Sequence, residues 1–300
     1  MAQKKQNTAV VQVILKKTKQ CGLLYTDCSR NAGRRHTHFT HESYLDYVKE
    51  KNLLVPILLA LCTGFRLECI LVDVLHAADL GMTAHIIGNI MWESVLQKYW
   101  GASTQEANVE LLAKDLDSWY KKTKCKVKLQ GKLTQQRIRA HGQFPKLKCK
   151  AAAARHLADY ALDVARRTST GSTHDQLKIA LAESLTRFYQ IMEENGQFFS
   201  PGVQGDFRQV GNDLSSMLSI LSAEAHAKGL RMWKYSPKVH LVEHMTGDQA
   251  AAFGNPRYFW CYADEDLVGL TIEVAENCQV FTVAEMVLVK WLILAFDQED

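Results

Sequence analysis

Apolar residues recur three or four positions apart over most of this chain, and that spacing sets the strongest limit on its fold. The clearest example is the stripe Leu177, Leu181, Leu185, Phe188 and Met192. Side chains at this spacing share one face of an α-helix, whereas a half-buried strand alternates apolar and polar residues. Similar helical signals occur in residues 82–100, 103–120, 151–167, 210–221 and 282–296. The sequence therefore predicts a mainly α protein.

Few segments have the composition of a strand. Residues 9–15 and 68–73 are short, rich in β-branched side chains and bounded by polar residues. Residues 53–62 are apolar, but Pro56 near their start leaves helix and strand both open. We expect a helical, bundle-like region together with a small and incomplete α/β part of two or three strands.

The strand candidates and the helical stripes suggest a division of the chain into three ranges. Residues 1–100 hold the strand candidates, residues 101–229 hold helical stripes alone, and residues 230–300 hold the C-terminal helices. We expect ranges 1–100 and 230–300 to form one part, with range 101–229 inserted between them as a helical insertion.

The chain shows no membrane or secretion signal. Its most hydrophobic stretch, residues 281–296, is interrupted by Glu285 and Lys290 and is shorter than the roughly 20 apolar residues that a bilayer span requires. We expect this stretch to be a buried terminal helix. The N-terminus lacks a signal-peptide pattern, and eight cysteines without tight repeated spacing are typical of a reduced protein. An intracellular protein without a membrane partner is expected.

The net charge is distributed very unevenly. Residues 121–150 carry eleven positive charges and no Asp or Glu, so the other 270 residues carry −7 within a total of +4. Clustered Lys and Arg favour phosphate groups, because binding releases condensed counterions. Gly131, Gly142 and Pro145 predict a loop with one short helix around residues 133–139. The candidate nucleic-acid-binding residues are Lys121, Lys122, Lys124, Lys126, Lys128, Lys132, Arg137, Arg139, Lys146, Lys148 and Lys150.

Two alternative interpretations of this basic segment stay open. It is a solvated loop without a ligand, or it pairs with the acidic remainder of the same chain.

A second motif has the spacing of a zinc site. His240, Glu243 and His244 match H-x-x-E-H, in which the two histidines lie on one face of a helix and the glutamate activates a zinc-bound water. A third ligand would come from Glu273 or Glu276 downstream. The alternative is a helix whose polar edge carries these side chains without a metal. A zinc hydrolase is therefore one hypothesis.

Two further segments place carboxylates at the start of expected helices. Asp73 and His76 form a D-x-x-H pair, and residues 264–266 are the acidic run Asp-Glu-Asp after an aromatic stretch. Carboxylates that lie far apart in sequence are what a two-metal phosphoryl-transfer site requires. Both segments also suit helix N-termini, where acids are favoured and where Asp73 would be a cap.

Taken together, these segments resemble the DDE transposases of the CACTA and related cut-and-paste groups over roughly residues 60–280. The matching motifs, in chain order, are Asp73-x-x-His76 with Gly81, Pro237-Lys238-x-His240 with His244, and the acidic run 264–266. The resemblance implies an RNase H-like sheet with a helical insertion, DNA as partner and a nuclear location. It further implies Mg²⁺-dependent strand cleavage and transfer by Asp73, or an upstream aspartate, together with Glu265 or Asp266, with His76 close to the site.

The chain departs from that family pattern upstream of Asp73. The family's first two aspartates belong to this region, where Asp27 and Asp46 are the only aspartates and neither follows a strand pattern. We therefore expect a transposon-derived DNA-binding protein with an incomplete RNase H-like remnant. A homo-oligomer of this protein is one of the expected states. The alternative from a different class is a helical interaction or structural protein without catalysis.

Overall fold

The computed structural model describes residues 41–52, 55, 62–66, 69–279 and 281–296. The chain divides into two compact units, with the boundary between Tyr258 and Phe259. All regular secondary structure in the described ranges is helical, so the prediction of a mainly α protein is confirmed. The predicted strand at residues 9–15 and nearly all of the ambiguous segment 53–62 lie outside the described residues.

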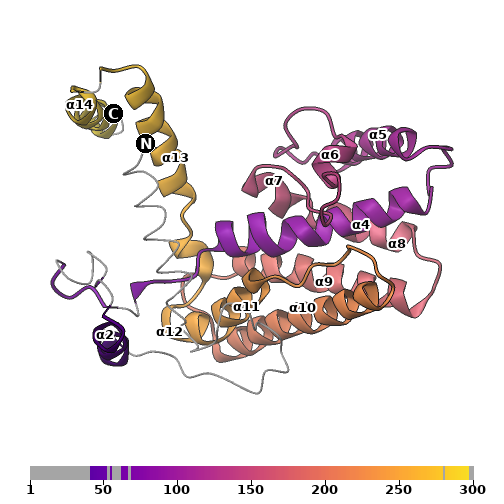
Figure 1. Ribbon diagram of the computed structural model, residues 1–300, viewed down its shortest axis with the longest axis horizontal. Helices are drawn as coiled ribbons and strands as arrows, with labels where there is room; N and C mark the ends of the chain where they lie inside the picture. The colour runs from indigo at the N-terminus through magenta and orange to yellow at the C-terminus, as the bar shows by residue number, and fades with distance from the viewer. Residues whose placement is uncertain (1–40, 53–54, 56–61, 67–68, 280, 297–300) are drawn as a thin grey trace. The chain divides into compact units, whose positions relative to one another are not determined.

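The first unit contains most of the helices (Figure 1). In chain order its longer elements are α2 (His41–Glu50), the π-helix η2 (Leu75–Thr83), α4 (Ala84–Leu96), α5 (Gln105–Thr123), α8 (Ala158–Arg167), α9 (Thr173–Glu194), α10 (Pro201–Ala227) and α11 (Pro237–His244). Its shorter elements are α6 (Gln135–Ile138), α7 (Ala151–His156), η3 (Met245–Gln249), α12 (Ala250–Phe253) and η4 (Pro256–Phe259), the last of which ends at the boundary.

The core of this unit is built on the apolar stripe of α9. Leu181, Leu185 and Phe188 are completely buried, as their spacing predicts. Phe188 stacks on Phe207 of α10 with a ring-centroid distance of 5.3 Å and an interplanar angle of 17°. Helices α9 and α10 lie side by side, and α8 packs on the opposite flank of α9 (Figure 1).

Helix α4 packs against several other elements of the first unit. It continues η2 without a break, so that the chain is helical from Val74 to Leu96. Ile86, Ile87 and Ile90 are fully buried. Helix α8 packs against one side of α4, and α5 and α6 pack against another (Figure 1). The chain between α5 and α7 carries most of the basic residues. It lies against α4 through α6.

The second predicted strand is wrong in its described part, residues 69–73, which form no strand. The Gln249 side chain explains the difference. Its Oε1 accepts from the Val72 backbone N–H at 2.7 Å, and its Nε2 donates to the Val72 carbonyl oxygen at 3.0 Å. A side-chain amide thus satisfies the backbone groups that a neighbouring strand would otherwise pair with. No strand occurs elsewhere in the residues that the structure describes.

Elements from all three predicted ranges pack within the first unit. Helix α4 from range 1–100 contacts α8 from range 101–229, and α10 from that range contacts α11 from range 230–300. A docked insertion is expected to pack in this way, so the division at residues 100 and 229 stays a prediction.

The second unit consists of α13 (Tyr262–Glu276) and α14 (Val283–Phe296), which pack on each other. The apolar stretch 281–296 is a helix as predicted, but Leu288 and Leu292 are exposed by 64% and 57%. The prediction that this helix is buried is therefore wrong for these side chains, and among the described elements of its unit α13 is the helix that packs on α14. Among the described helices, none combines the length and the hydropathy needed to cross a bilayer.

Candidate nucleic-acid interface

The basic segment 121–150 is mostly irregular chain that is anchored at both ends. Helix α5 ends at Thr123, and Lys124 adopts a left-handed conformation (φ 54°) that turns the chain away from the helix. The only helix before α7 is the four-residue α6, as the sequence predicts. The Arg137 guanidinium donates to the carbonyl oxygens of Gln130 and Lys148, so it ties the two halves of the segment together.

The C-terminal part of this segment lies directly on α4. The Leu147 N–H donates to the Ala84 carbonyl oxygen at 2.8 Å, and the Lys146 N–H donates to the Ile138 carbonyl oxygen at 2.9 Å. Gly88 permits this approach, because a Cβ at that position would lie 2.7 Å from the Lys146 nitrogen. The backbone around Lys146 is thus fixed by main-chain contacts.

Within the described ranges, the charged side chains of the segment form almost no ion pairs. Of its eleven Lys and Arg side chains, only Lys132 forms an ion pair with a described residue, at 3.3 Å from Glu110. Lys128 lies over the Tyr120 ring and Arg139 lies over the Trp92 ring. The exposed members that form no ion pair with a described residue are Lys121, Lys122, Lys124, Lys126, Lys128, Lys148 and Lys150. The acidic remainder in the described ranges therefore leaves this positive charge unneutralised.

Asp73 is the cap of the helix that begins at Val74. Its Oδ2 accepts from the backbone N–H of His76 at 2.9 Å and from the His76 Nδ1 at 2.7 Å. This arrangement satisfies one of the backbone donors that a helix leaves free at its N-terminus. The capping role that the sequence left open for Asp73 is therefore present in the structure.

The structure brings two of the matched motifs together. Lys238 of α11 donates from Nζ to the His76 carbonyl oxygen at 2.7 Å, across 162 positions of sequence. Gly81 makes room for it, since a Cβ there would lie 2.6 Å from the Lys238 Cδ. The glycine of the first motif thus leaves the space that the lysine side chain of the second motif occupies.

The H-x-x-E-H side chains do not surround a common point. Glu243 lies 3.1 Å from the Nδ1 of His240, whereas the Nε2 of His244 lies 3.0 Å from the Nε2 of His240. The carboxylate and the second imidazole thus contact opposite sides of one ring. In the described part of the chain, no group of three potential metal ligands contains any of these residues.

The remaining predicted acids belong to the second unit. Glu265 and Asp266 lie in the N-terminal part of α13 and are exposed, as is Asp264. Acidic side chains are favourable at this end of a helix, where backbone N–H groups are free. Asp73 and His76 belong to the first unit, and these acids belong to the second.

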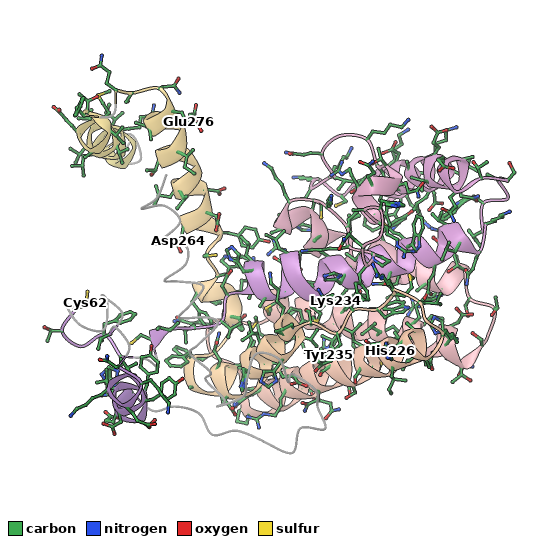
Figure 2. All side chains as sticks on the ribbon, in the orientation of Figure 1. Cys62, His226, Lys234, Tyr235, Asp264 and Glu276 are labelled. Atoms are coloured by element: carbon green, nitrogen blue, oxygen red, sulfur yellow. The ribbon has the colours of Figure 1, made fainter. Side chains whose placement is uncertain are left out.

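Sequence reasoning missed three basic residues outside 121–150. Arg231 and Lys234 lie between α10 and α11, where Figure 2 labels Lys234, and Lys238, which the sequence analysis named only as part of a motif, lies in the first turn of α11. The available signal was a second run without acids, residues 225–242, which carries four positive charges. It is shorter than the first run, and only its packing on α4 makes it part of the same surface.

A buried ionic network holds that second run in place. Glu93 of α4 accepts from Trp233 Nε1 at 2.6 Å, Lys178 Nζ at 3.1 Å and His174 Nε2 at 3.0 Å. Burial by itself raises the pKa of Glu93, but the His174 hydrogen bond and the Lys178 charge outweigh it and hold that pKa below its ordinary value. Lys178 is fully buried and also pairs with Asp175 at 2.8 Å. Trp233 is therefore fixed against α4.

His85 lies where the two basic runs meet. Its Nδ1 donates to the Pro145 carbonyl oxygen at 2.9 Å. Burial, with the charges of Lys146, Lys234 and Lys238 around it, lowers the pKa of His85 to about 4, although the Pro145 hydrogen bond opposes this. The histidine is thus neutral at pH 7 and sits among three lysines.

Comparison of the chain with protein-family models, with curated proteins and with solved structures finds no match.

Proposed function

We propose that this chain is a transposon-derived protein, similar to a DDE transposase, that binds DNA through residues 121–150. The observation that carries the proposal is the charge of this segment, since eleven cations share one ion pair with the described residues. If the segment paired with the acidic remainder of the same chain, carboxylates would lie beside its lysines, and among the described residues Glu110 is the one that does so. Unpaired Lys and Arg on an anchored segment favour a polyanionic partner, whose phosphates release counterions on binding.

The family resemblance is our reason for proposing DNA as the polyanionic partner. It rests on the D-x-x-H-x-x-x-x-G and P-K-x-H motifs, and their direct contact through Lys238, His76 and Gly81 supports reading them as one structural feature. An incomplete RNase H-like remnant, a nuclear location and a homo-oligomeric state belong to the same proposal.

Strand cleavage is not part of this proposal. A Mg²⁺ site of the transposase type needs several carboxylates around each ion. Within neither unit taken by itself do the described residues bring three potential ligands together. Asp73 also serves as a helix cap. The residues of each unit therefore do not fit such a site.

The experiment compares two variants of the full chain that lose equal charge. One carries Lys126→Gln, Lys148→Gln and Lys150→Gln, three exposed lysines of the segment, and the control carries Lys49→Gln, Lys98→Gln and Lys114→Gln, three exposed lysines outside it. Binding to a labelled DNA duplex is measured by fluorescence anisotropy at low salt. The segment variant is expected to bind at least about tenfold more weakly than the control, because each lost phosphate contact removes its share of counterion release.

Equal weakening of the two variants would show that the segment has no special role. The absence of DNA binding by the wild-type chain would instead favour the alternative, a helical interaction protein. The exposed apolar side chains of α14, such as Leu288, are the observation that favours this second candidate.

A further inference from the structure

We infer that five cationic side chains from two distant segments form one binding site for the phosphates of a DNA strand, laid out along η2 and α4. The members are Arg139, Lys146, Arg231, Lys234 and Lys238, which we call the α4 stripe. The inference rests on the proposed function, because it takes DNA as the partner. It adds the path of the strand and assigns binding residues outside the segment 121–150.

Lys238 and Lys146 contact the same helix at positions about two turns apart. The stem of Lys238 crosses η2 at Gly81 and its Nζ reaches the His76 carbonyl oxygen. Four residues beyond Gly81, His85 holds the Pro145 carbonyl oxygen next to Lys146. One turn further, Gly88 receives the backbone of Lys146 itself. These contacts fix where both lysines leave the protein surface.

Lys234 is positioned by the residue before it. The Trp233 N–H donates to the Asn89 Oδ1 at 2.7 Å, and its indole binds Glu93, so the chain at Lys234 is bound to α4 twice. The Lys234 Nζ lies 5.8 Å from the centre of the Phe144 ring. A residue of the second basic run therefore meets a residue of the first.

Two arginines continue the stripe toward the C-terminal end of α4. Arg139 lies over the Trp92 ring, with 5.4 Å from its Cζ to the ring centre, and its Nε donates to the Gln143 carbonyl oxygen at 2.9 Å. Arg231 donates to the Gly142 carbonyl oxygen at 2.7 Å. Both guanidinium groups are thus held on the same turn of the basic segment.

The length of the stripe suits a nucleic-acid strand. From Gly81 to Trp92 the helix advances by eleven residues, or about 16 Å at the α-helical rise. Each strand of a duplex carries one phosphate per about 3.4 Å of axis, so this length faces about five phosphates. Five cations in that length match the charge of one strand.

The electrostatics of the stripe favour the binding of an anion. Burial and the charge of Lys234 lower the pKa of Lys146, and burial and the charge of Lys146 lower the pKa of Lys238. Within the described ranges, neither Lys146 nor Lys234 forms an ion pair. The negative charge of Asp73 partly opposes the lowering of the Lys238 pKa. Gathering like charges costs free energy, which a bound phosphate would recover.

Surface lysines without a ligand behave differently. They extend into water and separate, because their mutual repulsion is relieved by rotation of flexible stems. Here Lys146 and Lys238 are partly buried, and three lysines converge on the half-buried His85 instead. The packing of the protein holds them together against their repulsion.

The test uses the full chain and a labelled duplex of about 20 base pairs in anisotropy titrations over a range of salt. The stripe variant is Lys146→Gln with Lys234→Gln, and the matched control is Lys49→Gln with Lys98→Gln, where Lys98 lies just beyond the end of α4. We expect the stripe variant to bind about tenfold more weakly than the control, with a salt slope smaller by almost two. Lys146→Arg with Lys234→Arg should restore most of the affinity.

Other results separate the two proposals. Duplex binding by the wild type, with the stripe variant equal to the control in affinity and slope, would overturn the stripe and leave the proposed function standing. No binding by the wild type would overturn both. Lys234→Gln alone changes an exposed side chain and so keeps the test valid if the double variant unfolds, since it should still reduce the salt slope by about one.

Discussion

Replacing Gly88 by alanine should destabilise the first unit by pushing the basic segment away from α4. The added Cβ would lie 2.7 Å from the Lys146 nitrogen and 2.8 Å from the Leu147 nitrogen, where ordinary contacts begin at 3.4 Å. These are backbone atoms, so they cannot rotate aside, and the segment must move by about 0.7 Å. The hydrogen bond from the Leu147 N–H to the Ala84 carbonyl oxygen at 2.8 Å is the first that such a shift strains.

The expected free-energy change combines three contributions. Overpacking costs about 1–3 kcal/mol and one weakened hydrogen bond about 1 kcal/mol, while replacing a mid-helix glycine by alanine recovers about 1 kcal/mol. The free energy of unfolding should therefore fall by about 1–3 kcal/mol, which urea denaturation followed by circular dichroism can measure. Gly205→Ala in α10 is the control, because nothing lies within 4 Å of its added Cβ. A Gly88→Ala protein as stable as Gly205→Ala would refute the close approach.

Two further predictions concern residues of the same region. The pKa of the His85 imidazole falls from 6.5 to about 4 on folding, so between these pH values only the unfolded chain binds a proton at this residue. His85 therefore contributes stability that is lost as the pH falls from about 6.5 to about 4. The loss amounts to about 3 kcal/mol, and His85→Gln should flatten the decline in urea denaturation between pH 7 and pH 4.5; an unchanged decline would contradict the assignment. Asp73→Ala should lower the free energy of unfolding by about 1 kcal/mol through loss of the helix cap. Asp73→Asn should keep most of this stability, because asparagine also caps helices. Equal losses of stability for the two variants in thermal unfolding would argue against capping.

The helices could be predicted from the sequence because their signal is local. The stripe of Leu181, Leu185 and Phe188 has the period of a helix, and these residues form the buried face of α9. The short helix within 121–150 was predictable for the same reason, since Gly131, Gly142 and Pro145 punctuate the chain around it.

The errors arise where a distant residue decides the local structure. Residues 69–73 have strand composition, but the amide of Gln249, 177 positions away from Val72, takes the backbone hydrogen bonds. In α14 the apolar composition of 281–296 predicts a helix but does not show how many neighbours cover it.

Only half of the proposed DNA-binding surface could be predicted from the sequence. Net charge along the sequence identified the segment 121–150, because a run without acids is a property of consecutive residues. The contribution of Lys234 and Lys238 depends on Trp233 docking at Asn89 and on Lys238 crossing Gly81, which are contacts between segments about 150 positions apart. The same contacts explain why a glycine and a lysine of two separate motifs belong together.

The central claim is that this protein binds the phosphates of DNA through positive charge that it does not neutralise itself. The salt dependence of the affinity of the wild-type chain for a duplex of arbitrary sequence tests this claim most directly. The logarithm of the association constant should fall linearly with the logarithm of the salt concentration, with a slope of about −4 or steeper if the five cations of the α4 stripe each contact a phosphate. An affinity that does not change between about 50 and 200 mM salt, or no binding at the lower concentration, would contradict it.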